Sequence, residues 1–180
     1  MSDKKDAKPF GFSSGTLLED IDCDFKELAN CIYTTSTPPN KHGKFEEYIF
    51  KVAPVSGLYW VKALGKTIST DSTGFLLQQE LDSMQARLNK VYGNSESISF
   101  STHGTIWNEP QDFMMGLLSN EIFYAASWNT ENCNLPSNLK SIYLGLSAID
   151  RDSGYMVLEY SFTNEDDAEE EVQNSEDGIL

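Results

Sequence analysis

Residues 73–93, TGFLLQQELDSMQARLNKVYG, carry the strongest periodic pattern in the chain. The apolar side chains recur at spacings of four, three, four and three residues, at Leu77, Leu81, Met84, Leu88 and Val91. This spacing places them on one face of an amphipathic helix. Ser72 or Thr73 supplies a helix start, and Gly93 suits the left-handed conformation just past a helix end. We therefore predict a helix over about residues 74–92.

Runs rich in aromatic and β-branched residues lie on both sides of this helix, and such runs are typical of β-strands. They predict strands at residues 31–37, 45–53, 58–64, 121–128, 139–149 and 155–163. Pro54 and Gly57 between the second and third runs predict a hairpin. Together, the elements predict an α+β fold: a single two-layer domain with an antiparallel sheet of about six strands and helices on one face.

Two shorter helices complete the predicted order. TLLE at residues 16–19 matches the S/T-x-x-E capping box, and Pro110 after Asn108 and Glu109 fits the first turn of a helix. Each short helix precedes three predicted strands. The order indicates two helix-plus-three-strand halves that flank the long central helix, although the halves share no residue-level identity and a common layout without duplication also explains it.

Negative charge dominates the whole chain. It has 28 acidic and 13 basic side chains, a net charge of -15. Eight acids lie in the last sixteen residues, EDDAEEEVQNSEDGIL, and the 20 that remain still exceed the 13 basic side chains by seven. Phosphate backbones and anionic lipid surfaces would repel both parts. The charge argues against direct nucleic-acid or membrane binding and favours a basic protein partner.

Composition divides the chain into three segments. Residues 1–8 are mostly polar and are expected to form a flexible N-terminus. Residues 9–164 hold most of the apolar and aromatic side chains and are expected to form one globular α+β domain. Residues 165–180 combine dense negative charge with little apolar surface, which predicts a disordered acidic tail. Such a tail is either a solubilising terminus or an electrostatic arm that steers a basic partner.

The sequence gives no indication of secretion, a membrane span, a metal site or a cofactor. No apolar run reaches the roughly 20 residues that cross a bilayer, and the first residues lack the apolar centre of a signal peptide. Cys23, Cys31 and Cys133 are odd in number and form no C-x-x-C pair, which favours reduced thiols. His42 and His103 have no cysteine or carboxylate at ligand spacing. We therefore expect a cytoplasmic protein that needs neither metal nor cofactor.

Two short motifs match parts of functional signatures. Residues 11–15, GFSSG, fit the G-x-S-x-G nucleophile elbow, but only ten residues precede them and neither histidine is marked as a base. Residues 150–154, DRDSG, begin like a calcium loop but lack the third oxygen ligand, the glycine and the glutamate that the loop needs further on. We interpret the first motif as a Gly/Ser turn and the second as a hairpin turn.

Five motifs recur in a recognisable combination: GFSSGTLLEDI, FEEYIFKVAPVSGLYWVKALGKTI, the helix end LNKVYG, GTIWNEP and VLEYSFTN. They resemble an uncharacterised family of small bacterial proteins that shares a G-F-x-x-G-x-x-L start, a P-x-x-G-L hairpin, a helix ending in Y-G and a closing L-E-Y-x-F-x-N. The resemblance covers most of residues 9–164 and omits the tail. It implies a compact single domain with an accessory or immunity role, and it assigns no site residue.

These observations predict a non-enzymatic acidic binding protein, an inhibitor of the immunity or antitoxin type that masks a basic surface of a toxin or nucleic-acid enzyme. One alternative is a DNA-mimicking regulator or anti-defence protein, which requires carboxylates at phosphate-like spacing on a continuous surface. The other alternative is a hydrolase that uses Ser13. The acidic side chains expected to contact the basic partner are Glu46, Glu47, Glu165, Asp166, Asp167, Glu169, Glu170 and Glu171.

Overall fold

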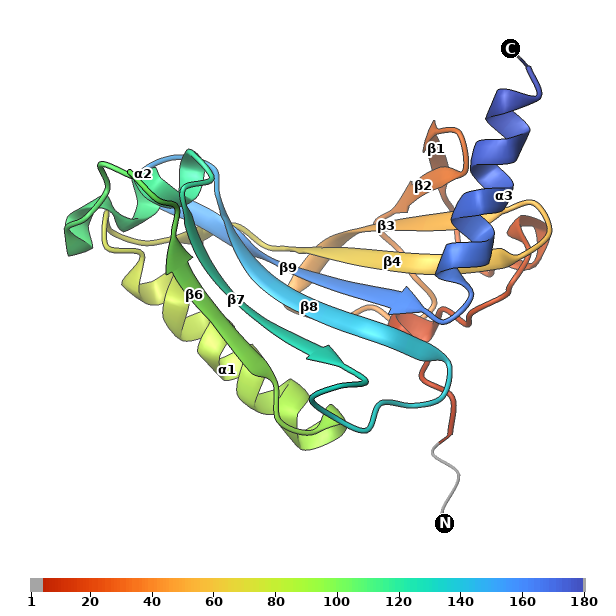
Figure 1. Ribbon diagram of the computed structural model, residues 1–180, viewed down its shortest axis with the longest axis horizontal. Helices are drawn as coiled ribbons and strands as arrows, with labels where there is room; N and C mark the ends of the chain where they lie inside the picture. Colours follow the sequence, from red (N-terminus) through yellow and green to blue (C-terminus); the bar gives the residue numbers. More distant parts are fainter. Residues whose placement is uncertain (1–4, 180) are drawn as a thin grey trace. The chain divides into compact units, whose positions relative to one another are not determined.

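The computed structural model describes residues 5–179, which form nine β-strands and three α-helices (Figure 1). This content confirms the predicted α+β class, whereas the predicted count of about six strands is too low. The strands pair in the order β1-β2-β3-β4-β9-β8-β7-β6, and β5 pairs with β9 apart from this path. The strands are β1 Lys26–Ala29, β2 Ile32–Thr35, β3 Phe45–Ala53, β4 Gly57–Gly65, β5 Ile68–Ser69, β6 Glu96–Ser101, β7 Ile122–Asn129, β8 Leu139–Ala148 and β9 Ser153–Phe162.

All six predicted strands are present, with ends within two residues of the predicted ones. The three strands that the sequence missed are β1, β5 and β6. Every residue of β1 is exposed, β5 has only two residues, and five of the six residues of β6 are exposed. A strand that buries few side chains carries few apolar residues: β1 and β5 show no sustained alternation, and the alternation in β6 is limited to Ile98 and Phe100 among serines.

Residues 5–179 group into two compact units, each described here by itself. The first unit contains residues 5–63, 135–142 and 159–179. Its core is aromatic, and the side chains of Phe12, Phe45, Tyr48, Phe50 and Phe162 are at most 2% exposed. The expectation of a single domain over residues 9–164 stays a prediction.

The start of the first unit is attached to a loop far along the chain. The backbone N–H of Ala7 donates to Asn138 Oδ1 at 2.9 Å, and Asn138 Nδ2 donates to the Ala7 carbonyl at 2.8 Å. Pro9 is buried. Of the predicted flexible N-terminus, residues 1–4 lie outside the described residues, while Ala7 is held by these two hydrogen bonds.

The second unit contains residues 64–134 and 143–158, and its main helix is α1, Phe75–Tyr92. The helix predicted over about residues 74–92 is therefore confirmed. Four of the five residues of the predicted apolar face are buried: Leu77, Leu81, Met84 and Leu88. The fifth, Val91, is 67% exposed, because it lies in the last turn of the helix.

The two ends of α1 differ from each other. Gly74 precedes the helix and has no side chain to cap it, while the first-turn N–H of Leu76 donates to Thr70 Oγ1 at 3.3 Å, so the predicted cap at Ser72 or Thr73 is wrong. At the other end Gly93 has φ of +100°, a region that favours glycine, and the carbonyl of Gly93 accepts a hydrogen bond from Trp128 Nε1 at 2.8 Å. The predicted role of Gly93 as the helix terminator is confirmed.

Of the two short predicted helices, one is present. Pro110–Asp112 form a 3-10 helix that leads into α2, Phe113–Leu118. Residues 16–19 form no α-helix, because only Leu18–Asp20 adopt a 3-10 turn. The first predicted half therefore lacks its α-helix, and the layout of two helix-plus-three-strand halves does not hold.

The acidic tail differs most from its prediction. We expected disorder over residues 165–180, whereas Glu165–Asp177 form the third helix, α3. Glu165, Asp166 and Asp167 occupy the first turn, where negative charge interacts favourably with the helix dipole. The side chain of Ala168 is fully buried, so tertiary contacts supply what the self-repelling sequence lacks.

Candidate functional site

Helix α3 is the most acidic element of the protein, and it docks on the β3–β4 hairpin through a small apolar contact. Ala168 forms a buried cluster with Ala53 and Tyr59, and Trp60 and Val172 pack against this cluster. Ala168 and Val172 are four residues apart, which puts both on one side of the helix. Ala168 and Val172 are the only side chains of α3 in this apolar cluster, and both are short. The other contacts between α3 and the sheet described below are polar.

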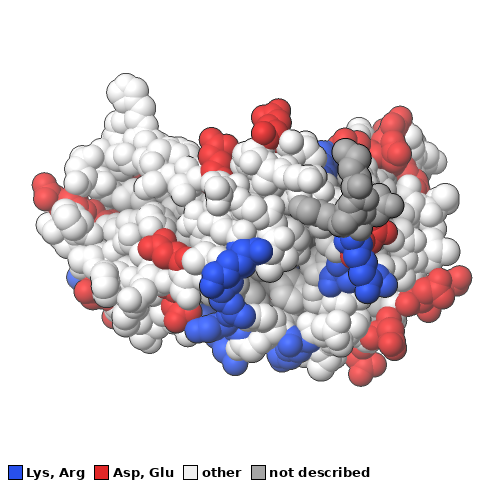
Figure 2. Space-filling view, turned by 90° about the horizontal axis from the view of Figure 1, so that it is seen from below, with Lys and Arg blue, Asp and Glu red and all other residues white. Residues whose placement is uncertain are grey.

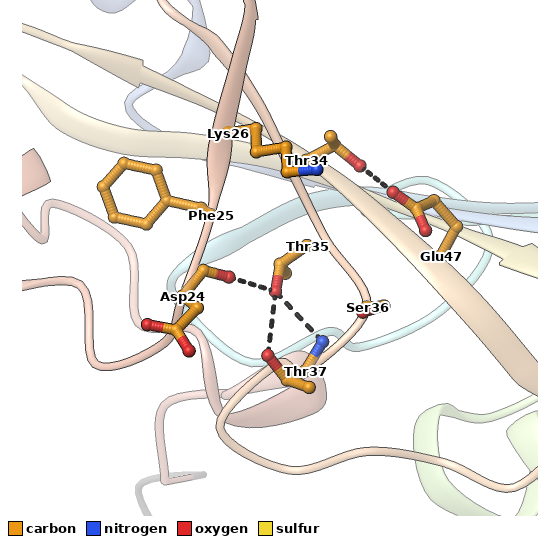
Figure 3. A pocket seen from close by; sticks show the side chains of 8 residues that line it. All are labelled: Asp24, Phe25, Lys26, Thr34, Thr35, Ser36, Thr37 and Glu47. Carbon is orange, nitrogen blue, oxygen red and sulfur yellow. Dashed lines mark hydrogen bonds between the residues drawn. The ribbon is translucent and has the colours of Figure 1, made fainter.

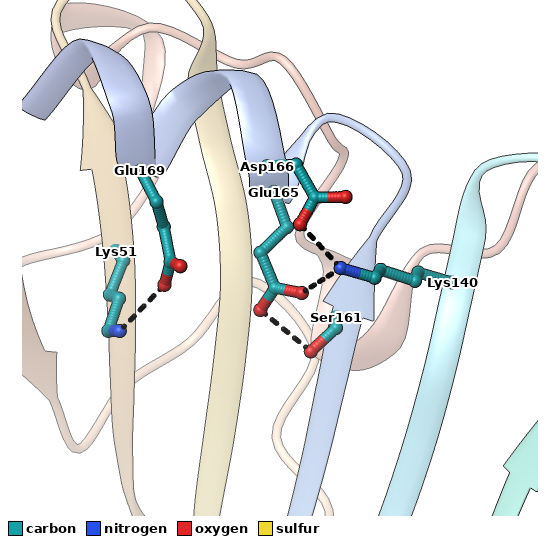
Figure 4. Close-up of polar contacts among 6 residues, drawn as sticks. All are labelled: Lys51, Lys140, Ser161, Glu165, Asp166 and Glu169. Atoms are coloured by element: carbon teal, nitrogen blue, oxygen red, sulfur yellow. Dashed lines mark hydrogen bonds and ion pairs between the residues drawn. The ribbon is translucent and has the colours of Figure 1, made fainter.

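Two lysines of the sheet form ion pairs with acidic side chains of α3 (Figure 4). Lys51 Nζ on β3 lies 3.5 Å from Glu169 Oε1. Lys140 Nζ on β8 lies 3.2 Å from Glu165 Oε2 and 2.6 Å from Asp166 Oδ1. The hydrogen bond to Asp166 is the main reason why the pKa of Lys140 is raised. These pairs are partly exposed, so each contributes little stability alone, but together they fix which side of α3 faces the sheet.

Aromatic rings lie beside the same lysine. Lys51 Nζ is 5.0 Å from the ring centroid of Trp60 and 5.9 Å from that of Tyr59, distances at which a cation is attracted to an aromatic face. Burial, followed by the negative charges of Glu169 and its neighbours, raises the pKa of Tyr59 to about 12. The Tyr59 phenol is therefore neutral at physiological pH.

The backbone of the hairpin turn is held by one carboxylate of α3. Glu171 accepts hydrogen bonds from the backbone N–H groups of Val55 and Ser56 at 2.6 and 2.9 Å, and from Ser56 Oγ at 2.7 Å. Further along the helix, Glu176 accepts a hydrogen bond from Asn30 Nδ2 at 2.9 Å. Both carboxylates thus attach α3 to turns between strands.

The pKa of Glu171 reflects this arrangement. Burial alone would raise the pKa of its carboxyl group, but the hydrogen bonds from Ser56 Oγ and from the two backbone N–H groups favour the charged form. The net result is a pKa below the ordinary value for glutamate. Glu171 is therefore an ionised anchor for the helix.

The opposite side of α3 presents acids to solvent. Asp167, Glu170 and Asp177 are exposed, and none of their three carboxylates makes a hydrogen bond or ion pair within residues 5–179. Asp166 has 78% of its side chain exposed although it pairs with Lys140. The helix thus uses its inner acids for attachment and holds its outer acids in a fixed row.

The eight acids predicted to bind a partner therefore have different surroundings. Glu165, Asp166, Glu169 and Glu171 are bound to other residues of the chain. Glu47 accepts a hydrogen bond from the Thr34 hydroxyl. Glu46, Asp167 and Glu170 are exposed and have no such contact among the described residues. Contact with a partner stays a prediction for all eight.

A cavity of about 370 Å³ lies beside β1 and β2 (Figure 3). Thr35 Oγ donates to the Asp24 carbonyl at 2.6 Å and accepts from the Thr37 N–H at 3.0 Å. The Thr34 hydroxyl donates to Glu47. Because these polar groups already pair with one another, the cavity is a weaker candidate for ligand binding than the exposed side of α3.

The motifs that resembled catalytic or metal sites lie in turns. Ser13 lies between two 3-10 turns and not between a strand and a helix, so the elbow geometry is absent there. Asp150 Oδ1 accepts hydrogen bonds from the Asp152 N–H at 3.0 Å and from Ser153 Oγ at 2.8 Å, which confirms a turn between β8 and β9. Residues 5–179 contain no group of three or more metal-binding side chains in reach of one ion.

No protein-family model, curated protein or solved structure matches the chain. Within residues 5–179, no helix combines the length and the apolar composition that crossing a membrane requires.

Sequence reasoning missed the docking surface of α3. Lys51, Trp60, Ser56 and Lys140 were assigned to strands or loops without a common role, because they are up to 89 residues apart in the chain. Two local signals were present in the tail itself. Three acids follow Asn164, as in the first turn of many helices, and Ala168 and Val172 share the spacing of one helix face.

Proposed function

We propose that this protein is a non-enzymatic binding protein that masks a basic surface of another protein, in the manner of an immunity or antitoxin-type inhibitor. The observation that carries the proposal is the division of α3 into two sides. Its inner acids bind the hairpin and the sheet, while Asp167, Glu170 and Asp177 face solvent without a contact among the described residues.

A docked helix suits this role better than a disordered tail. A carboxylate row that is already ordered loses less conformational freedom when a basic partner binds. The surrounding negative charge, -15 in total, would also steer a basic partner toward the helix and raise the association rate.

The acids on one face of the molecule favour the proposed function over DNA mimicry. On the face shown in Figure 2, acidic side chains lie in small separate groups with basic and uncharged side chains between them. A DNA mimic needs carboxylates at phosphate-like spacing on a continuous surface. The ordered row on α3 is short and fits a local basic patch.

The test is affinity capture from the native cell with the full chain and with a Glu170→Lys/Asp177→Lys variant. Both substitutions lie outside the first turn of α3, so they reverse charge without opposing the helix dipole there. We expect one basic protein to be captured, less of it as the salt concentration rises, and at least about tenfold less with the variant.

The matched control is Glu19→Lys/Asp22→Lys, which makes the same change in net charge at exposed positions that do not belong to α3. Equal loss in the two variants would indicate an effect of net charge alone. Capture that is unaffected by salt and by both variants would contradict the proposal.

A further inference from the structure

Strand β6 forms one end of the strand order, next to β7 (Figure 1). All six of its residues pair with β7 in an unbroken antiparallel register, for example Ile98 with Ala125 and Phe100 with Phe123. No strand among residues 5–179 pairs with the other side of β6. The backbone N–H and C=O groups along such an edge are able to accept a further strand.

The edge has few of the features that usually prevent strand addition, and its only charged residue is Glu96 at the start of the strand. β6 contains no lysine and no proline, and its register with β7 shows no bulge. Phe100 stacks on Phe123 with ring centroids 4.7 Å apart, yet 52% of its surface stays exposed. A side chain from an added strand would cover this ring.

Strand β6 carries one acidic residue, Glu96, at its first position. Residues 97–108, SISFSTHGTIWN, contain no acidic residue, in a chain that has 28 of them. Two copies of so acidic a protein repel each other over most of their surface. This repulsion is weak along the rest of β6, because Glu96 is the only charged residue of the strand.

We propose that β6 is a homodimer interface, in which β6 of a second copy adds antiparallel to it around a two-fold axis at Ser99. In this register Ile98 lies opposite the partner's Phe100, and Ser97 lies opposite the partner's Ser101. A β-branched residue opposite an aromatic one is a stabilising cross-strand pair, and the symmetry makes this pair occur twice.

The same register avoids the charge conflict that an acidic chain would otherwise meet. Glu96 falls opposite the partner's Thr102, so no two carboxylates face each other across the new strand pair. β6 thus complements itself in side-chain type and in charge, which is why a second copy fits this edge.

Salt separates this association from the proposed binding of a basic partner. The Debye length is about 8 Å at physiological ionic strength, so salt screens the repulsion between two copies. Dimerisation through β6 therefore strengthens as the salt concentration rises, whereas binding of a basic protein weakens. The dimer does not depend on the proposed function, and either one can fail without the other.

The first measurement is sedimentation of the full chain over a range of protein and salt concentrations. We expect a monomer–dimer equilibrium that shifts toward dimer with salt. Ser99→Asp places two carboxylates directly opposite each other at the axis and should weaken dimerisation roughly five- to tenfold. Ser83→Asp, at an exposed position of α1, adds the same charge and should leave the equilibrium nearly unchanged.

A second measurement tests the register by disulfide formation under mild oxidation. In the proposed dimer the two copies of residue 99 are direct neighbours with Cα atoms about 5 Å apart, within disulfide range. The two copies of residue 97 are offset by four residues, roughly 13 Å, and cannot be bridged. Ser99→Cys should therefore cross-link to a covalent dimer, and Ser97→Cys should behave like the unmodified chain.

Several results would overturn the proposal. They are a monomer at every concentration and salt level, a dimer that ignores Ser99→Asp, and cross-linking of Ser97→Cys as fast as that of Ser99→Cys. A chain that stays monomeric but binds a different protein in a way that Ser99→Asp abolishes would assign the edge to another occupant and would also overturn it.

Discussion

Helices α1 and α3 are held to the protein by opposite means. α1 buries Leu77, Leu81, Met84 and Leu88, whereas α3 buries only Ala168 and relies on carboxylates for the rest. Each large apolar side chain that is fully buried contributes about 1.5–3 kcal/mol. The partly exposed ion pairs of α3 contribute about 1 kcal/mol or less each. The comparison teaches that α1 belongs to the core, and it predicts that the docking of α3 depends on pH and salt.

The largest expected effect is on α1. Leu81→Ala removes a side chain that is 1% exposed and should lower the free energy of unfolding by about 2–5 kcal/mol. Urea denaturation followed by circular dichroism measures it. Val91→Ala on the same helix, at a site that is 67% exposed, is the control and should change stability by less than about 0.5 kcal/mol. Equal losses would mean that burial does not distinguish the two positions.

The next effect concerns the anchor of α3. Glu171→Ala removes the acceptor for Val55 N–H, Ser56 N–H and Ser56 Oγ and should weaken docking by about 1–2 kcal/mol. Backbone amide exchange within α3 should accelerate roughly tenfold, while exchange in α1 stays unchanged. Glu170→Ala, at an exposed neighbouring position, is the matched control. Unchanged exchange in the Glu171 variant would show that the apolar contact alone holds the helix.

Acid should loosen α3 through the same residue. Because the pKa of Glu171 is lowered in the folded protein, its stabilising contribution is present above the ordinary glutamate value and is lost as the pH falls through the folded value. The rate of backbone amide hydrogen exchange in α3, divided by the intrinsic rate of an unfolded chain at the same pH, should rise as the pH falls. In Glu171→Gln this rate should depend less on pH.

A peptide of residues 165–179 provides the contrast to that acid effect. Without the sheet, protonation only relieves repulsion among the carboxylates, so the peptide should gain helicity as the pH falls. Opposite pH responses of the peptide and the docked helix would show that docking depends on the ionised form. A parallel response would contradict the assigned role of Glu171.

The smallest effect is expected at the ion pairs. Lys140→Met removes the partner of Glu165 and Asp166 and should cost up to about 1 kcal/mol at low salt, because the lysine side chain is 43% exposed. High salt should reduce the difference, since it screens the pairs in the unmodified protein. Thermal denaturation at two salt concentrations measures it, with Lys66→Met, at an exposed site, as the control. If the stability difference between Lys140→Met and the unmodified protein persists at high salt, it arises from packing of the aliphatic part of Lys140 and not from the ion pairs.

The period-2 and 3.6-residue patterns predicted the elements that bury a continuous face. The strand over residues 45–53 and helix α1 are the clearest examples, because every turn or alternate residue faces the core. The same method missed β6, whose alternate positions are serines, and gave no helix for the tail. In each segment the apolar face has only two side chains, Ile98 and Phe100 in β6 and Ala168 and Val172 in the tail, which is too short a pattern to stand out.

The sequence predicted which acidic residues make up the candidate site on α3, but it did not predict that they lie on two sides of an ordered helix. The sequence pointed to the acids of residues 165–171 as a charged surface, which they are. It could not divide them into inner and outer acids, because the division depends on where Lys51, Lys140 and the β3–β4 turn lie in space.

The amino-acid sequence by itself determined the α+β class, the position of α1, the six longer strands and the excess of negative charge, because each of these follows from local pattern or composition. Only the tertiary structure decided that the acidic tail is a docked helix and that β6 ends the strand order. Both features result from contacts between residues far apart in the chain. A self-repelling segment becomes ordered only when lysines and backbone N–H groups from elsewhere are brought within hydrogen-bonding distance of its carboxylates.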